Sequence, residues 1–540
     1  MMTEDQISTI LDDLTLDEMI GQMLCFNLAD KYTEDDIRNI VKKTHAGSFF
    51  VAGVQPDRIR VCTEIINQHT KLPAMIAADI ENGPGHVLPG TVRLPSPMAW
   101  GACNDPSLIE EAHARTAAVC RLAGIHWSFS PIVDINYNPD NPVTNIRAIS
   151  DQPAQVEKIA CAAIRGLQRD GWIMAGCKHF PGDGVDDRNQ HFCTTVNSLS
   201  KEEWINTYGR VYQAMFRENV ASVMVGHIAL PAYDEPLNAW VGYPPGSLSR
   251  HLQTNLLREE LGFDGCIVSD ALSMVGACAA VPYDRLSVEF VKAGGDMLLF
   301  PTAEYFNEIK NAVKAGEIPM ERIRDAVRHI LILKDRARLF EDQKKLLQSI
   351  PDPWDLQALS DQIGEKSLHV VRDFDNILPL QLKQGDKILI LNIKKDKNPE
   401  TAFFCCDLTV VEEELRNRGF QVKSYTNAAR NDFQAELDEC AAVLINCKMS
   451  SQDYAGGSLR IGWPHIAPFW RGAVLRHPKM VFTSFGDPYK IYDFPYLKTY
   501  INAFSDSEST QRAFVKAILG EIPFLGKSPV GLPGYFSAEV

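Results

Sequence analysis

The chain has 540 residues, of which 45% are hydrophobic and 23% are charged, values that exclude a disordered or collagen-like protein. The formal net charge is −15 at pH 7, so nucleic acid and anionic lipid are unfavourable partners. The N-terminal residues show no basic segment followed by an apolar one, and no stretch is apolar enough to cross a membrane, so we expect a cytoplasmic protein. The 13 cysteines have no paired spacing, which argues against disulfides and structural zinc.

Short apolar runs alternate with helical patterns from residue 15 to about residue 340. This alternation is typical of a parallel sheet built from βα units. The predicted strands are 47–53, 74–80, 127–135, 173–180, 222–229, 265–271 and 297–300. The predicted helices between them include 106–123, 155–170 and 252–261, with a last one at 320–339. Ser200 and Glu203 form the pattern of a capping box, in which each side chain accepts from the other residue's backbone N–H.

Seven or eight βα units favour a closed barrel over an open sheet, and no Gly-x-Gly-x-x-Gly turn follows the first strand. A second run of elements includes the strand-like segments 388–393, 441–445 and 481–484, with helices near 410–418 and 510–519. We therefore predict an α/β protein with an N-terminal (β/α)8 TIM-like barrel in residues 1–345. A linker at 346–360 leads to a smaller C-terminal α/β sandwich in residues 361–540.

Polar residues end five successive predicted strands of the barrel. In such barrels the carboxyl ends of the strands face the active site, and many buried polar groups at one rim cost free energy unless a ligand uses them. A sugar-sized polar ligand fits this rim. The residues are Asp79 and Glu81, Asp134 and Asn136, Lys178 and His179, His227, and Asp270.

The segment 175–191 holds the highest density of chemically active side chains. Its glycines and proline indicate a long loop after a strand, and it carries one lysine, two histidines and three aspartates. From its residues alone, this loop is a ligand-binding or acid/base loop.

Five ordered motifs resemble glycoside hydrolase family 3, in particular its β-N-acetylhexosaminidase branch. The stretch Lys178-His179-Phe180-Pro181-Gly182 is similar to the Lys-His-Phe-Pro-Gly signature of that branch. The other four motifs are at residues 79–83, 138–142, 145–147 and 269–274, and residues 484–489 with 519–521 look like the C-terminal domain of the family.

The resemblance implies a retaining double displacement without metal or organic cofactor. It places Asp270 as the nucleophile and His191 as the acid/base. It also implies a set of residues that hold the sugar, namely Asp79, Arg147, Lys178, His179, His227 and Met274.

Several positions depart from the pattern of this branch. Asn189 stands where an Asp partner of the acid/base is usual, and an Asn stabilises an imidazolium less than a carboxylate does. The branch usually carries His where this chain has Asp183, and the segment after Gly83 lacks the usual Arg. The departures bear on the identity of the sugar more than on the nucleophile.

The first reading is thus a retaining exo-β-glycosidase, specifically a β-N-acetylhexosaminidase, with a small carbohydrate as its partner. Three alternatives remain open: a phosphorylase that uses phosphate in place of water, a β-glucosidase or β-xylosidase with a Glu from the C-terminal domain as acid, and a sugar-binding protein without turnover. We expect no nucleic-acid or membrane partner, and a homodimer is one possible assembly.

Overall fold

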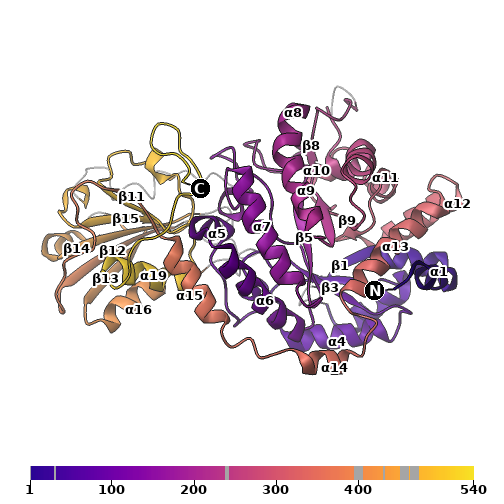
Figure 1. Cartoon of the computed structure of the whole chain (residues 1–540), viewed down its shortest axis with the longest axis horizontal. Coiled ribbons are helices and arrows are strands. Elements are labelled where there is room, and N and C mark those ends of the chain that lie inside the picture. The colour runs from indigo at the N-terminus through magenta and orange to yellow at the C-terminus, as the bar shows by residue number, and fades with distance from the viewer. Residues whose placement is uncertain are drawn as a thin grey trace. The chain divides into compact units, whose positions relative to one another are not determined.

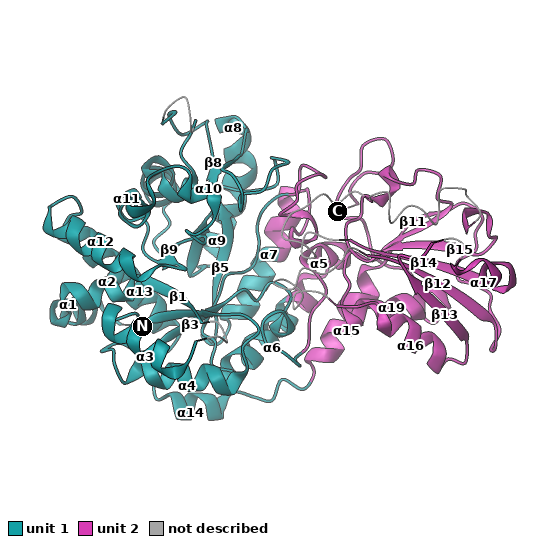
Figure 2. Cartoon of the chain, turned by 180° about the vertical axis from the view of Figure 1, so that it is seen from behind, with its two compact units in different colours: residues 1–91, 110–135, 160–354 teal, residues 92–109, 136–159, 355–540 magenta. Residues whose placement is uncertain are grey.

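The computed structural model describes residues 2–28, 32–237, 242–394, 406–429, 432–449, 461 and 474–539. The chain forms two compact units, shown in teal and magenta in Figure 2. Unit 1 comprises residues 1–91, 110–135 and 160–354, and unit 2 comprises residues 92–109, 136–159 and 355–540. Within the described residues, no helix combines the length and the apolar character that crossing a membrane requires.

Unit 1 contains a nearly closed eight-stranded parallel barrel, as predicted. Its strands follow the order β10-β1-β2-β3-β4-β5-β7-β9, and a parallel bridge between Val268 and Met297 brings the two ends together. The strands are β1 (Leu24–Leu28), β2 (Ser48–Val51), β3 (Met75–Ala78), β4 (Trp127–Ser128), β5 (Met174–Phe180), β7 (Ser222–Val225), β9 (Cys266–Ser269) and β10 (Leu298–Leu299). A further two-stranded pair is formed by β6 (Thr195–Val196) and β8 (Ile228–Ala229).

The barrel strands are buried because helices surround them, as the teal unit of Figure 2 shows. The helices are α1 (Glu4–Asp13), α2 (Leu16–Gln22), α3 (Glu34–Thr44), α4 (Pro56–Asn67), α8 (Lys201–Trp204), α9 (Arg210–Arg217), α10 (Val275–Cys278), α11 (Leu286–Ala293), α12 (Ala303–Lys314), α13 (Met320–Arg336) and α14 (Gln343–Ser349). The helical segment between β7 and β9, η5 (His251–Glu260), matches the predicted 252–261. The predicted capping box at Ser200 is present at the start of α8. Two further helices, α6 (Pro106–Leu122) and α7 (Pro153–Gln168), run from unit 2 into unit 1.

Unit 2 is built on a six-stranded sheet in the order β11-β16-β15-β14-β12-β13. All pairs are parallel except β11 with β16. The strands are β11 (His369–Asp373), β12 (Lys387–Lys394), β13 (Gln421–Thr426), β14 (Ala442–Lys448), β15 (Met480–Ser484) and β16 (Thr499–Asn502). The helices are α5 (Pro97–Cys103), α15 (Leu356–Ser367), α16 (Thr409–Asn417), α17 (Gln434–Glu439) and α19 (Glu508–Ile518), of which α16 and α19 cover one face of the sheet (Figure 1).

Alternate residues of β12 face two separate apolar cores, because side chains of a strand point to opposite faces in turn. Ile388 and Ile390 pack into the core that contains residues of α16 and α19. Leu389 and Leu391 pack into the other core, which also contains Met98 of α5 and Ile146. The early segments 92–109 and 136–159 thereby complete the hydrophobic core of unit 2.

The boundary between the predicted domains is more complex than a single linker. The predicted linker 346–360 is helical at both ends, since it includes the end of α14 and the start of α15. The division of the chain at 345 and 361 into two domains stays a prediction. The compact units are not continuous in sequence, since residues 92–109 and 136–159 belong to unit 2.

Candidate active site

Lys178 forms a charge cluster with two acids at the carboxyl ends of the barrel strands. Its Nζ lies 2.6 Å from Asp79 Oδ1 and 2.7 Å from Glu81 Oε1, and both acids follow β3. Lys178 and Glu81 are buried, whereas the Asp79 side chain keeps 28% of its exposure. Asp79 is therefore the member of this trio that a ligand reaches most easily.

His179 is held by a carboxylate from the neighbouring strand end. Its Nδ1 lies 2.7 Å from Asp134 Oδ2, and because a carboxylate only accepts, Nδ1 carries the proton. The other oxygen of Asp134 accepts from the N–H groups of His179 and Asp183 at 3.1 and 2.8 Å. The register of β5 against β7 shifts between Cys177 and Phe180, and such irregularities next to active sites redirect side chains.

Asp270 directly follows β9 and lies beside this histidine. The distance between its Oδ2 and His179 Nε2 is 4.0 Å, and its Oδ1 accepts from the N–H of Ala271 at 2.7 Å. Burial raises the pKa of Asp270, but the nearby His179, His227, His191 and Lys178 outweigh this effect and hold the pKa below its ordinary value. The carboxylate is therefore ionised and partly accessible, as a nucleophile requires.

His227 is fully buried, and both of its ring nitrogens have partners. Nε2 donates to the carbonyl oxygen of Ala271 at 3.0 Å, and Nδ1 then accepts from the Ser247 hydroxyl at 2.8 Å. Burial lowers the pKa of His227, although Asp270 opposes this shift. The sequence suggests that His227 holds a sugar hydroxyl, whereas this geometry favours a role in holding the segment next to Asp270.

His191 lies on the loop that follows β5, with Asn189 as its partner. Asn189 Oδ1 accepts from the backbone N–H of His191 at 3.0 Å, which identifies it as the amide oxygen. His191 Nδ1, at 2.7 Å from the same oxygen, therefore carries a proton and donates to it. The carbonyl oxygen of His191 accepts from the N–H of Val275 at 3.1 Å. This bond joins the loop of His191 to the segment that follows Asp270.

The last two predicted site residues differ in their surroundings. Met274 precedes α10, is nearly buried, and donates its N–H to the carbonyl oxygen of Ala271. Arg147 belongs to unit 2, where it ends the short helix η2 (Asn145–Arg147) and donates from Nη1 to the carbonyl oxygen of Val143.

Two residues that contribute to the site carry little sequence signal. Ser247 lies in a loop without a motif, and only the fold brings it to His227. Gln190 falls inside the loop of residues 175–191, but its side chain is uncharged and it lies outside the five motifs quoted above. Its contacts become visible only in three dimensions.

A second charged cluster of the described residues resembles a metal site. Asp296, Asp325 and His329 come close enough together to suggest metal ligands. However, the Asp296 carboxylate already accepts from Arg258 Nη2 at 2.5 Å and from Arg322 Nη2 at 2.6 Å. Two guanidinium groups at the same carboxylate fit a structural ion cluster and disfavour a divalent cation there.

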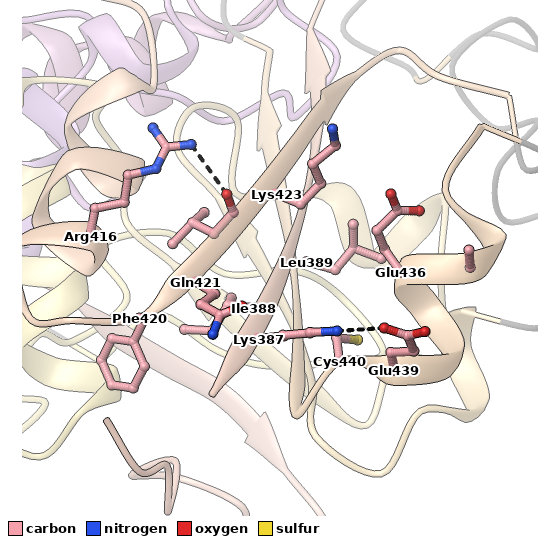
Figure 3. A pocket seen from close by; sticks show the side chains of 12 residues that line it. Lys387, Ile388, Leu389, Arg416, Phe420, Gln421, Lys423, Glu436, Glu439 and Cys440 are labelled. Carbon is pink, nitrogen blue, oxygen red and sulfur yellow. Dashed lines mark hydrogen bonds and ion pairs between the residues drawn. The ribbon is translucent and has the colours of Figure 1, made fainter. Parts of the chain in front are cut away.

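A pocket of about 480 Å³ opens on unit 2, between the ends of β12 and β13 and the helix α17 (Figure 3). Its charged groups are largely paired, since Lys387 Nζ lies 2.5 Å from Glu439 and Arg416 donates to the carbonyl oxygen of Val422. None of the predicted site residues lines this pocket.

Comparisons with known proteins agree on the family. The profile of the glycosyl hydrolase family 3 N terminal domain matches residues 15–333. The chain is 29% identical to a β-N-acetylglucosaminidase/β-glucosidase of Cellulomonas fimi, over 97% of this chain and 95% of the relative. It is 28% identical to a β-hexosaminidase of Methylobacillus flagellatus, over 52% of this chain and 80% of the relative.

Among solved structures, the β-glucoside phosphorylase BglX bound to 2FGlc superposes with a TM-score of 0.87 and 29% identity, over 98% of this chain and 97% of that one. A family profile that covers more than half of the chain, together with the barrel and its motifs, identifies this protein as a glycoside hydrolase family 3 enzyme.

Proposed function

We propose that this enzyme is a retaining exo-β-glycosidase that removes a terminal β-linked N-acetylhexosamine, with Asp270 as nucleophile. The observation that carries the proposal is the setting of Asp270 at the end of β9, where it lies 4.0 Å from His179 and has a lowered pKa. An ionised carboxylate that is partly accessible attacks an anomeric carbon to give a covalent glycosyl-enzyme, which water then resolves.

His191 is the acid/base of this proposal. Its Nδ1 proton is engaged by Asn189, so Nε2 is the atom that gives a proton to the leaving group and later takes one from water. The bond between His191 and Val275 holds this loop next to the segment that carries the nucleophile. The polar cluster of Asp79, Lys178 and His179 supplies charged groups for the hydroxyls of the sugar.

The choice of an N-acetylhexosamine rests on similarity rather than on a contact in the site. The Cellulomonas fimi relative, which the chain matches along almost its whole length, is described as both a β-N-acetylglucosaminidase and a β-glucosidase. A β-hexosaminidase matches about half of this chain, 52%, at 28% identity. Glucose is therefore the competing sugar that the test has to include.

Phosphorolysis is a second candidate, and a specific observation favours it. The partner of His191 is the neutral Asn189, so the acid/base lacks the fixed negative charge that would repel a phosphate dianion. Two structures named β-glucoside phosphorylase BglX cover 98% of this chain at 28 and 29% identity.

One assay separates these possibilities. The purified protein is given 4-nitrophenyl β-glycosides of N-acetylglucosamine, N-acetylgalactosamine, glucose and xylose, with and without inorganic phosphate. The proposal predicts the fastest release from an N-acetylhexosaminide, and loss of release in Asp270→Asn. The control variant Asp187→Asn changes an exposed acid of the same loop and should keep activity.

The products decide between water and phosphate. Free sugar at the same rate with and without phosphate supports hydrolysis. Acceleration by phosphate with formation of a sugar 1-phosphate supports phosphorolysis. Turnover that survives in Asp270→Asn would contradict both mechanisms.

A further inference from the structure

Gln190, which lies between Asn189 and the proposed acid/base, is one of the most completely buried polar residues of the described chain, with 0% exposure. Its side-chain oxygen accepts from the N–H of His227 at 2.9 Å. Its amide nitrogen lies 3.3 Å from Asp183 Oδ2 and donates to it. The side chain of Gln190 thus bonds to Asp183, at the start of the same loop, and to His227, in the segment after β7.

Two glycines lie very close to Gln190. A Cβ atom at Gly276 would lie 2.3 Å from the carbonyl oxygen of Gln190, and a Cβ atom at Gly226 would lie 2.9 Å from its side-chain oxygen. Both distances are shorter than real carbon contacts allow. The two glycines therefore permit the close approach of three backbone segments around this side chain.

Both hydrogen-bond partners of Gln190 are connected by further hydrogen bonds to groups near Asp270. Asp183 donates its N–H to Asp134, and Asp134 holds His179, which faces Asp270. On the other side, His227 donates to the carbonyl oxygen of Ala271, the residue next to Asp270. The side chain of Gln190 is therefore tied to both walls of the site, while its own backbone continues into His191.

We infer that Gln190 is a positioning residue, which fixes His191 at the distance and angle that proton transfer to the leaving group requires. The inference rests on the proposed role of His191 and deepens it. Gln190 itself touches neither the sugar nor the reacting atoms. Its effect is geometric, because proton transfer demands a donor within hydrogen-bond reach of the departing oxygen.

A positioning role makes a specific kinetic prediction. A leaving group such as 2,4-dinitrophenolate departs without a proton, whereas a methoxide leaving group needs one. A displaced His191 therefore lowers kcat/KM for methyl glycosides far more than for dinitrophenyl glycosides. A general loss of structure lowers both in proportion, because it only reduces the amount of active enzyme.

The experiment compares kcat/KM for methyl and 2,4-dinitrophenyl β-glycosides of the sugar that the wild-type enzyme prefers. The variants are Gln190→Ala and Gln190→Glu. The second variant keeps the oxygen that accepts from His227 but places a carboxylate against Asp183. We expect a loss of about 10- to 100-fold for the methyl glycoside and of less than about 3-fold for the dinitrophenyl glycoside in both variants.

A double variant tests the contact itself. In Gln190→Glu with Asp183→Asn the donor and the acceptor exchange places, so the amide of residue 183 donates to the carboxylate of residue 190. We expect this pair to recover the methyl-glycoside rate to within about 3-fold of wild type, as coupled neighbours do in a double-mutant cycle. Failure of the pair to recover any of the loss would overturn the inference.

Two control variants keep the outcomes distinct. Gln155 is another buried glutamine, which donates to the carbonyl oxygen of Gly101 at 2.7 Å, and Gln155→Ala should leave the ratio of the two rates unchanged. His191→Ala should show the same leaving-group dependence as the Gln190 variants, but larger.

If His191→Ala loses both substrates equally, the proposed acid/base is wrong. If His191→Ala shows the dependence and the Gln190 variants lose both substrates equally, Gln190 has only a structural role and the inference is overturned.

Discussion

The N–H of Val275 donates to the carbonyl oxygen of His191 at 3.1 Å, which joins the acid/base loop to the segment that follows Asp270. The two groups that the proposed mechanism needs at one anomeric centre thus come from loops that hold each other.

His227 should act through the segment next to Asp270 rather than through the sugar, because both of its ring nitrogens are bonded within the protein. We expect His227→Ala to lower kcat by about 10- to 100-fold with little change in KM. Steady-state kinetics on the preferred aryl glycoside measures both constants. A large increase in KM at constant kcat would show instead that His227 binds the substrate directly.

Asn189 offers a neutral oxygen, rather than a carboxylate, to His191 Nδ1. In Asn189→Asp a carboxylate at the same place stabilises the imidazolium. The acid in the first step must be protonated, so the alkaline limb of the kcat/KM profile should move to higher pH. If phosphate accelerates the wild-type enzyme, the same variant should lose part of this acceleration. An unchanged pH profile would argue against His191 as the acid.

Lys178 pairs with two carboxylates in a largely buried cluster. In Lys178→Met, Asp79 and Glu81 keep their charges without this cation, and breaking a buried pair in this way costs about 3–5 kcal/mol. We expect a clear drop in the free energy of unfolding in urea and an increased KM.

Lys71→Met removes a lysine that pairs with Asp13 and Glu18 near the surface and should change the unfolding midpoint very little. Equal effects of Lys178→Met and Lys71→Met would contradict the importance of the buried cluster.

The barrel strands could be predicted because each is a short apolar run between polar segments, and seven of the eight coincide with predicted runs. The exception is β1, whose sequence Leu-Cys-Phe-Asn-Leu follows α2 without a turn residue to mark its start. The membership of residues 92–109 and 136–159 in unit 2 could not be predicted. Met98 and Ile146 are ordinary hydrophobic residues in the sequence, and only the folded chain shows which hydrophobic core they belong to.

Contacts between residues of the sequence motifs could be predicted. Hydrogen bonds between residues far apart in the chain could not. Lys178 with Asp79, and His179 with Asp270, come together because parallel strands of a barrel end at the same rim. The partners of His227 and Gln190 are separated from them along the chain, and no spacing in the sequence encodes these hydrogen bonds.

Asp296 is a stabilising residue of unit 1 rather than a metal ligand. Burial raises its pKa, but His329, Arg258 and Arg322 hold the pKa well below its ordinary value. We expect Asp296→Asn to cost about 3–5 kcal/mol of unfolding free energy at pH 7, because two guanidinium groups lose their counter-charge.

The pH dependence of this loss follows from the direction of the shift. A carboxylate with a lowered pKa in the folded state stabilises above its unfolded pKa of about 3.9, and the contribution fades as the pH falls through the folded value. The difference between wild type and Asp296→Asn should therefore shrink below about pH 4. A rise in the unfolding free energy of the wild type on addition of Zn²⁺ or Mg²⁺, absent in Asp296→Asn, would favour a metal site instead.

The most direct test of the account is to trap the covalent intermediate. A glycosyl fluoride that carries a second fluorine on the sugar ring forms the glycosyl-enzyme quickly and loses it slowly, because the fluorine destabilises the oxocarbenium-like transition state of hydrolysis. The enzyme is incubated with such a reagent of the preferred sugar, digested and examined by mass spectrometry. We predict a single glycosyl adduct on the peptide that contains Asp270, and no adduct in Asp270→Asn. An adduct on another residue, or labelling that persists in Asp270→Asn, would contradict the assignment of the nucleophile.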